Sequence, residues 1–138
     1  MLKKYPQKSV KDIMKHLFHG SNETDPKKIY ESDVGLDRRF SKDSGLYGNG
    51  IYFANNSQYS HNYAWKVPEG NGKKFQMFVC LVLKGDSTTR PEKQYKVPPF
   101  KLNSQTERYD SINNGQGGHT IIYDNLKSYP GYLVTYTL

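Results

Sequence analysis

The segments Leu17-Phe18-His19-Gly20-Ser21 and Gly48-Asn49-Gly50-Ile51-Tyr52-Phe53-Ala54 decide how this sequence folds. Each places one chemically useful polar side chain, His19 or Tyr52, in an apolar strand-like run with glycine beside it. Strand interiors disfavour glycine, because it adds backbone entropy and contributes nothing to packing. Glycine at these points indicates that something flat approaches the backbone closely. The two strands therefore predict a ligand cleft.

Composition limits the class of protein. A chain of 138 residues predicts one domain, and the 12 tyrosines among 14% aromatic residues suit a core with a wet cleft. The net charge of +7 suits nucleotides, nucleic acid or acidic proteins as partners, although a solubilising lysine-rich surface is the simpler explanation. Cys80 is the only cysteine and lies in an apolar run, so we expect a buried side chain, not a nucleophile.

Membrane and secretion signals are not found. No segment is long and apolar enough to span a bilayer, and the basic N-terminus lacks the apolar core of a signal peptide. We therefore expect no membrane partner and a location in the cytoplasm or the nucleus.

Hydrophobic periodicity predicts strands joined by short helices. Segment 33–50 and most of the polar, proline-containing segment 85–108 are predicted to be irregular, and Ser128–Gly131 is predicted to join two strands. The predicted fold is α+β: a curved antiparallel sheet or split β-sandwich with a few short helices. Helices are expected over 9–16, where Ser9 and Asp12 form a capping box, over 26–31 and over 57–65, and strands over 17–19, 51–53, 75–83, 120–123 and 132–137.

Two short motifs resemble a metal site and a phosphate-binding loop, but neither interpretation fits its surroundings in the sequence. His16 and His19 have a spacing that a zinc site can use, but on a strand they point to opposite faces, so we expect no metal. Segment 45–50 resembles a phosphate-binding loop, but a strand follows it instead of a helix that begins with Lys-Ser or Lys-Thr.

The tyrosines give a more specific hypothesis. Tyr52 on its strand and Tyr63 on the following helix are placed to form the two walls of a slot for a flat cationic ring. Backbone groups of Gly20 and the hydroxyl of Ser60 are placed to hold a carboxamide. Ordinary core tyrosines and a hydrogen-bonded strand histidine remain the alternative.

The same residues resemble the catalytic domains of poly(ADP-ribose) polymerases and of their mono-ADP-ribosylating relatives, closest to the tankyrase and mono-transferring branch. The matching motifs follow the family order over about residues 16–138. They are Leu17–Ser21, Gly35–Phe40, Gly48–Ala54, Ser60–Tyr63, Met77–Asp86, Pro98-Pro99, Tyr109–Ser111 and Tyr129–Tyr136.

The resemblance implies a split β-sandwich that binds NAD⁺, transfers ADP-ribose and releases nicotinamide. It implies that His19 binds the adenosine ribose and that Ser21 reaches the adenosine side. It further implies that Gly20 and Ser60 hold the nicotinamide carboxamide, and that Tyr52 and Tyr63 enclose the nicotinamide ring.

The sequence departs from the family at the third catalytic position. Counting back from Tyr123 places His119 where most members have a glutamate, so the triad becomes His19, Tyr52 and His119. In this family, loss of the glutamate removes chain elongation. Neutral His119 is able to accept a hydrogen bond from a ribose hydroxyl, whereas protonated His119 would repel the positive charge of the transition state. We therefore expect activity to fall at acidic pH.

Together these observations predict a monomeric, single catalytic domain over 1–138, with a short lead over 1–15. The expected activity is NAD⁺-dependent transfer of one ADP-ribose to a protein acceptor or a nucleic-acid phosphate. Two alternatives stay open: an inactive module that binds NAD⁺ or ADP-ribose, and an NAD⁺ glycohydrolase.

Overall fold

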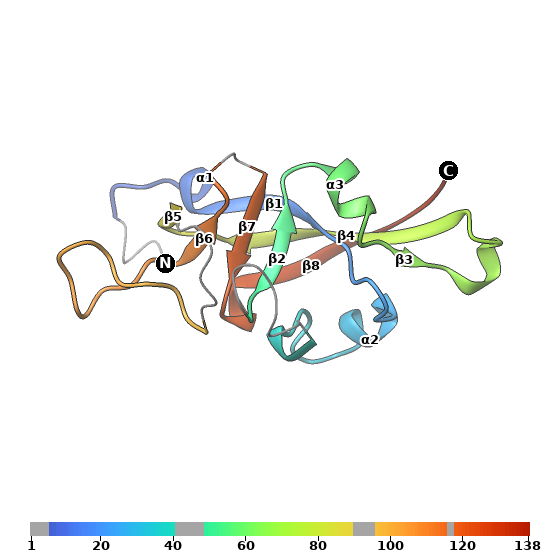
Figure 1. The fold of residues 1–138 in the computed structure, drawn as a ribbon, viewed down its shortest axis with the longest axis horizontal. Coiled ribbons are helices and arrows are strands. Elements are labelled where there is room, and N and C mark those ends of the chain that lie inside the picture. The colour runs from blue at the N-terminus through green and yellow to red at the C-terminus, as the bar shows by residue number, and fades with distance from the viewer. Residues whose placement is uncertain (1–5, 41–48, 90–95, 116–117) are drawn as a thin grey trace.

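The computed structural model describes residues 6–40, 49–89, 96–115 and 118–138. Within them the chain forms one open, mixed sheet with short helices, which confirms the α+β class (Figure 1). The strands are β1 (Met14–His19), β2 (Ile51–Ala54), β3 (Trp65–Lys66), β4 (Lys74–Leu83), β5 (Ser87–Thr89), β6 (Ser111–Asn113), β7 (His119–Ile122) and β8 (Ser128–Thr137). The helices are α1 (Val10–Ile13), α2 (Pro26–Tyr30) and α3 (Ser57–His61), with 3₁₀ turns η1 (Arg38–Phe40), η2 (Pro68–Gly70) and η3 (Asn125–Lys127).

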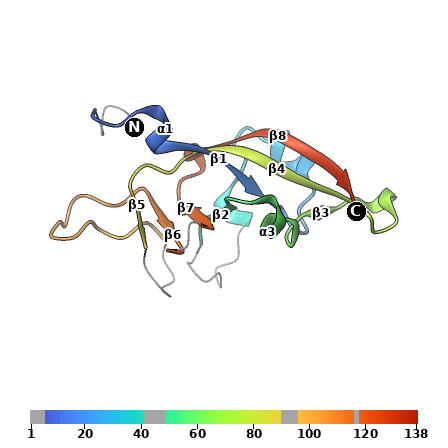
Figure 2. The same cartoon turned by 90° about the horizontal axis from the view of Figure 1, so that it is seen from above.

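The sheet divides into two groups of strands. Its order is β3-β4-β1-β2-β7-β6-β5, and β8 pairs with the edge of β4 that β1 does not use. Between β1 and β2 the only register partners are Phe18 and Ala54, so the group of β4, β1 and β8 bends away from the group of β2, β7 and β6 (Figure 2). The described pairs are antiparallel except β5 with β6, which is parallel and departs from the predicted antiparallel sheet.

The long apolar run forms β4, as predicted, and β4 pairs with β1, β3 and β8. Its alternate side chains enter the main core, as the period of a strand requires. Cys80 is completely buried there, and burial raises the pKa of its thiol to about 12. The main core consists of Leu17, Ile29, Leu36, Ile51, Phe53, Phe78, Cys80, Val82 and Ile122.

A second, smaller core lies on the other face of β2 and β7. Ile51 and Phe53 enter the main core, while Tyr52 between them packs against Ile121 and its neighbours Ile112 and Tyr123. This alternation places Tyr52 on the face opposite the main core and leaves part of its side chain exposed.

Two predicted helices are shorter than expected. The first ends at Ile13 because residues from Met14 onward pair with β4, although the capping contact from the Ser9 amide to Asp12 Oδ2 forms at 2.8 Å. The third ends at His61 because Trp65 and Lys66 pair with β4 as β3. In both places strand pairing prevails over local helical preference.

The prediction that Ser128–Gly131 is a connection between strands is wrong, because these residues belong to β8. Tyr129 and Tyr132 are partners of Leu81 and Val79, so two residues of β8 lie opposite Cys80 alone. Such a bulge accommodates Pro130, which has no amide hydrogen to donate to the ladder.

The segment after β4 is more ordered than predicted. Gly85 has φ +53°, and a Cβ there would lie 2.2 Å from Asp110 Oδ2, so this close approach requires glycine. The carboxylate of Asp110 accepts a hydrogen bond from the Asp86 amide at 2.9 Å and lies 3.4 Å from Lys127 Nζ. Asp86 in turn pairs with Lys101 and Lys8, and these contacts lower its pKa to about 2. The junction sets the register in which β5 and β6 begin.

In the part of the chain that the structure describes, no helix is long and apolar enough to cross a membrane.

Candidate functional site

A cleft of about 510 Å³ lies where β1, β2 and β7 meet α3. Its walls contain every residue that the sequence predicts for the site, which are His19, Gly20, Ser21, Tyr52, Ser60, Tyr63 and His119. These residues come from segments 100 positions apart, and the split between β1 and β2 brings them together. The structure therefore assembles the predicted set around one cleft, while the role of each residue remains a prediction.

His19 ends β1 and is fixed by the neighbouring strand. Its Nδ1 lies 2.7 Å from the carbonyl oxygen of Tyr52, and a carbonyl only accepts, so Nδ1 carries a hydrogen and donates. Burial lowers the pKa of His19, which favours the neutral ring. In this tautomer Nε2 has a lone pair, so His19 acts as a hydrogen-bond acceptor.

Gly20 allows β1 and α3 to approach closely. A Cβ at this position would lie 2.5 Å from the backbone carbonyl of Tyr63 and 2.8 Å from that of Ser60. Ser60 is buried at 3% exposure, yet its hydroxyl is not among the buried polar atoms that lack a partner. Because no described residue hydrogen-bonds this hydroxyl, it is open to the cleft.

Tyr59 of α3 and Tyr63, which follows the end of α3, form one wall. These tyrosines are four residues apart, with ring centroids 5.6 Å apart and hydroxyls 3.4 Å apart. Their hydrogen bond, together with partial burial, raises the pKa of Tyr59 to about 12, so it stays neutral. Tyr63 is 46% exposed and Tyr52 faces the cleft from β2.

Ser21 lines the cleft with its hydroxyl used locally. Ser21 Oγ donates to the carbonyl of Thr24 at 2.7 Å and closes the turn that leads to α2. Asn22, at φ 55°, donates its amide to the carbonyl of Tyr63 at 2.7 Å. The turn is therefore tied to α3, and Ser21 reaches a ligand only with lone pairs that this bond leaves available.

His119 begins β7 directly opposite Ala54, so it shares a sheet face with Tyr52. Its ring centroid is 4.1 Å from that of Tyr59. Its Nδ1 lies 3.3 Å from Nδ2 of Asn114, whose Oδ1 accepts from the amides of Gly118 and His119 at 3.2 and 3.3 Å. Desolvation lowers the pKa of His119.

Sequence reasoning missed three residues of this site. Tyr59 and Asp37 line the cleft, and Asn114 holds His119 from behind. The spacing of Tyr59 and Tyr63 by four residues was a usable signal for a shared helix face. Asn114 gave no signal, because its contact with His119 forms only in the folded chain.

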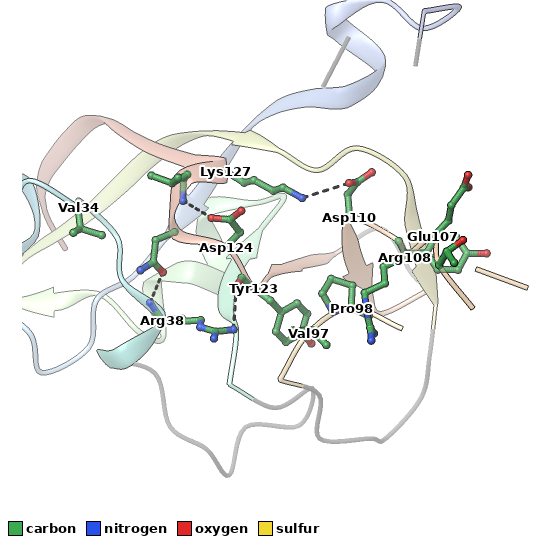
Figure 3. Close-up of a pocket in the computed structure, with 14 residues that line it drawn as sticks. Val34, Arg38, Val97, Pro98, Glu107, Arg108, Asp110, Tyr123, Asp124 and Lys127 are labelled. Atoms are coloured by element: carbon green, nitrogen blue, oxygen red, sulfur yellow. Dashed lines mark hydrogen bonds and ion pairs between the residues drawn. The ribbon is translucent and has the colours of Figure 1, made fainter. Parts of the chain in front are cut away.

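A second hollow of about 820 Å³ lies between η1, η3 and the segment before β6, and Arg38 and Arg108 line this hollow instead of the cleft (Figure 3). Arg38 donates to the carbonyls of Lys96 and Tyr123 at 2.7 and 3.0 Å. Arg108 donates to Pro98 and lies over the Phe100 ring at 3.8 Å. Arg39 pairs with buried Asp37. These arginines thus have structural partners.

Within the described ranges, no group of three or more His, Cys, Asp or Glu side chains is placed to hold a metal ion. His19 and His119, the two histidines that line the cleft, each have a hydrogen-bond partner at Nδ1.

The split sheet and its cleft define an α+β domain of the ADP-ribosyltransferase type. Comparison with known proteins agrees, because the family model described as the poly(ADP-ribose) polymerase catalytic domain matches residues 1–138. The chain therefore belongs to the poly(ADP-ribose) polymerase catalytic domain family, whose enzymes use NAD⁺ as co-substrate.

Individual relatives give the same result. A probable poly(ADP-ribose) polymerase of Dictyostelium discoideum is 40% identical over 134 residues, which cover 96% of this chain and 36% of that protein. Human protein mono-ADP-ribosyltransferase PARP14 is 32% identical over 126 residues, 88% of this chain and 7% of that protein. Mouse protein mono-ADP-ribosyltransferase PARP10 is 32% identical over 122 residues, 86% of this chain and 12% of that protein. The chain thus spans little more than a third of the first relative and much less of the others.

Proposed function

We propose that this chain is an NAD⁺-dependent mono-ADP-ribosyltransferase. The observation that carries the proposal is the joining of His19, Tyr52, Tyr63 and His119 in one cleft. The similarity to relatives named mono-ADP-ribosyltransferases supports it. The proposed acceptor is a protein side chain, and a nucleic-acid phosphate is the other acceptor to be tested.

The proposed chemistry needs uncharged side chains around the cationic nicotinamide ring of NAD⁺. The bond between ribose C1′ and the nicotinamide nitrogen breaks through an oxocarbenium-like state, and its electron pair leaves with nicotinamide. An acceptor oxygen then bonds to C1′ and gives up its proton, if it carries one, to solvent. His19 and His119 both have lowered pKa values, so neither adds positive charge near neutral pH.

In this proposal each wall of the cleft contacts a different part of NAD⁺. His19 Nε2 accepts a hydrogen bond from a hydroxyl of the adenosine ribose and orients NAD⁺. The rings of Tyr52 and Tyr63 contact the nicotinamide, and Gly20 with the Ser60 hydroxyl holds its carboxamide. Orientation of the scissile bond accounts for a large part of such catalysis.

An inactive module that binds NAD⁺ or ADP-ribose is the second candidate, and one observation favours it. Asp37 supplies the only carboxylate among the described residues that line the cleft, and it is paired with Arg39 and Asn125. No described carboxylate is therefore available to activate an acceptor.

Incubation with NAD⁺ labelled in the adenylate part separates these functions. A single ADP-ribose on protein or nucleic acid, with release of nicotinamide, supports the proposal. Binding without release indicates the module, and release without a labelled acceptor indicates a glycohydrolase; either result rejects the transferase. Tyr63→Ala should abolish labelling, whereas Tyr132→Ala, an exposed tyrosine on β8, should leave it unchanged.

His119→Glu tests the third position directly. A glutamate here restores the acceptor oxygens that most of the family has, so we expect faster transfer or the addition of further ADP-ribose units. Gel electrophoresis of the labelled product distinguishes a single unit from a chain. A rate below that of the unchanged protein would count against the assignment of His119 to this position.

A further inference from the structure

The two cleft histidines face hydrogen-bond partners of opposite kind. His19 Nδ1 meets a carbonyl oxygen, which is an acceptor, whereas His119 Nδ1 meets the side chain of Asn114. The amide of Asn114 contains one acceptor and one donor, so its orientation decides what His119 Nδ1 does.

Two backbone contacts determine that orientation. The amides of Gly118 and His119 are donors and point at one atom of Asn114, at 3.2 and 3.3 Å. Only an oxygen accepts from them, so this atom is Oδ1, and the remaining Nδ2 faces His119 Nδ1 at 3.3 Å. Since Nδ2 donates, Nδ1 accepts through its lone pair, and the hydrogen of the neutral ring lies on Nε2.

The rest of the surroundings also favour a neutral ring. Tyr59, the titratable group in contact with the ring, has its hydroxyl directed to Tyr63 and stays protonated. Ala54 lies opposite on β2. The charged group that lines the same cleft, Asp37, is paired with Arg39. Protonation of Nδ1 would set two donors against each other, which costs free energy.

Nε2 is the atom of His119 that remains for a ligand. No described residue hydrogen-bonds it, and it is not among the buried polar atoms that lack a partner, so it is accessible. We propose that Asn114 is a positioning residue that holds His119 as the neutral Nε2–H tautomer, which presents a hydrogen-bond donor to the cleft.

This inference rests on the proposed function and changes it at one point. The sequence suggested that His119 accepts a hydrogen bond from a ribose hydroxyl. With the hydrogen on Nε2, His119 instead donates, so the group that meets it must have a lone pair. The third position is then complementary to a ligand oxygen, whereas His19 is complementary to a hydroxyl hydrogen.

Tautomers are measured directly by long-range ¹H–¹⁵N correlation spectra of the histidine-labelled chain above pH 7. We expect an unprotonated Nδ1 and a protonated Nε2 in His119, and the reverse in His19, which serves as internal reference. A protonated Nδ1 in His119, or rapid averaging between tautomers, overturns the proposal. This measurement does not depend on transfer, so it stays valid if the proposed function fails.

Asn114→Asp tests the positioning role. Its Oδ1 still accepts from both amides, but the second oxygen now accepts from Nδ1–H, so the pKa of His119 should rise by about 1–3 units. Above the raised pKa the neutral ring keeps its hydrogen on Nδ1, so Nε2 no longer donates and the affinity for NAD⁺ should be lower than in the unchanged chain at the same pH. Asn113→Asp is the matched control, because it adds the same charge one residue away. The side chain of Asn113 contacts Thr89 and Ser87, so the pKa of His119 should stay unchanged in this variant.

Equal titration midpoints in Asn114→Asp and in the unchanged chain overturn the proposal. If Asn114→Asp does not fold, Asn114→Ser replaces the amide by a hydroxyl that both donates and accepts, so the tautomer of His119 should then average. A His119 that keeps one tautomer in Asn114→Ser shows that another group fixes the ring.

Discussion

The His19 wall and the His119 wall of the cleft are built by different means. His19 is fixed by a backbone carbonyl of the adjacent strand and by a glycine that allows α3 to touch β1. His119 is fixed by a side-chain amide and by the ring of Tyr59. A backbone contact survives most substitutions, whereas a side-chain contact is removed by one. The comparison indicates that the first wall is constrained by the fold, and the second is open to change.

Gly20→Ala should give the largest effect, because its Cβ would overlap backbone atoms of Tyr63 and Ser60. We expect a loss of about 1–3 kcal/mol in the free energy of unfolding, measured with urea, and loss of NAD⁺ binding. Gly131→Ala is the control, since its nearest neighbour lies at 3.6 Å. Unchanged NAD⁺ affinity in Gly20→Ala would show that the wall is not rigid.

His19→Ala and His119→Ala compare the walls directly. The first leaves the carbonyl of Tyr52 without its side-chain partner, which should cost about 1–3 kcal/mol of unfolding free energy. The second removes a longer contact at a partly buried position and should cost less than about 1 kcal/mol. Equal losses in the two variants would remove the distinction between the walls.

The pH dependence of stability should follow from the lowered pKa values of both histidines. Each unfolded histidine binds a proton near pH 6.5, while the folded ring resists it to lower pH. Stability is therefore fully present above pH 6.5 and declines as pH falls toward the folded values, by at most about 1.4 kcal/mol per unit for each ring. Thermal unfolding between pH 5 and 8 measures it, and His19→Gln should flatten the curve; a rise in stability on acidification would contradict the prediction.

Tyr136→Phe should give the smallest effect. Tyr136 hydroxyl lies 2.6 Å from His61 Nδ1 and ties the end of α3 to β8. Its loss should cost about 0.5 kcal/mol, the low end for a hydrogen bond, and should loosen Tyr59. The His119 wall should therefore be affected more than the His19 wall. Thermal unfolding and the His119 resonances check this against Tyr132→Phe, an exposed tyrosine on the same strand. Broadening of His19 instead would reverse the expected order.

The strong apolar signals made most of the fold predictable. The run that forms β4 and the glycine-flanked β2 have a local pattern that agrees with their final environment. Strands β5 and β6 are short and polar, and they exist because the Gly85–Asp110 junction places them side by side. The continuity of β8 through Pro130 depends on a bulge opposite Cys80, which the sequence of β8 alone does not encode.

The sequence predicted those site residues whose neighbours in the chain already indicate a strand beside a cleft. His19, Gly20 and Tyr52 stand in strand contexts that already indicate a cleft, and the structure places them around one. The hydrogen-bonding character of His119 was not predictable, because it depends on which atom of Asn114 faces the ring. That atom is decided by the backbone amides of Gly118 and His119, which meet Asn114 only in the folded chain.

Cys80 gives the molecule a practical property. It is the chain's single cysteine, and its thiol is sealed in the core with a pKa of about 12, so thiol reagents should leave the folded protein untouched. A cysteine introduced at an exposed position therefore becomes a unique attachment point for a fluorophore or spin label. Lys66→Cys on β3 and Leu126→Cys on η3 would place such reporters at separate parts of the molecule. Movements of α3 or of the cleft then become visible without first removing a native thiol.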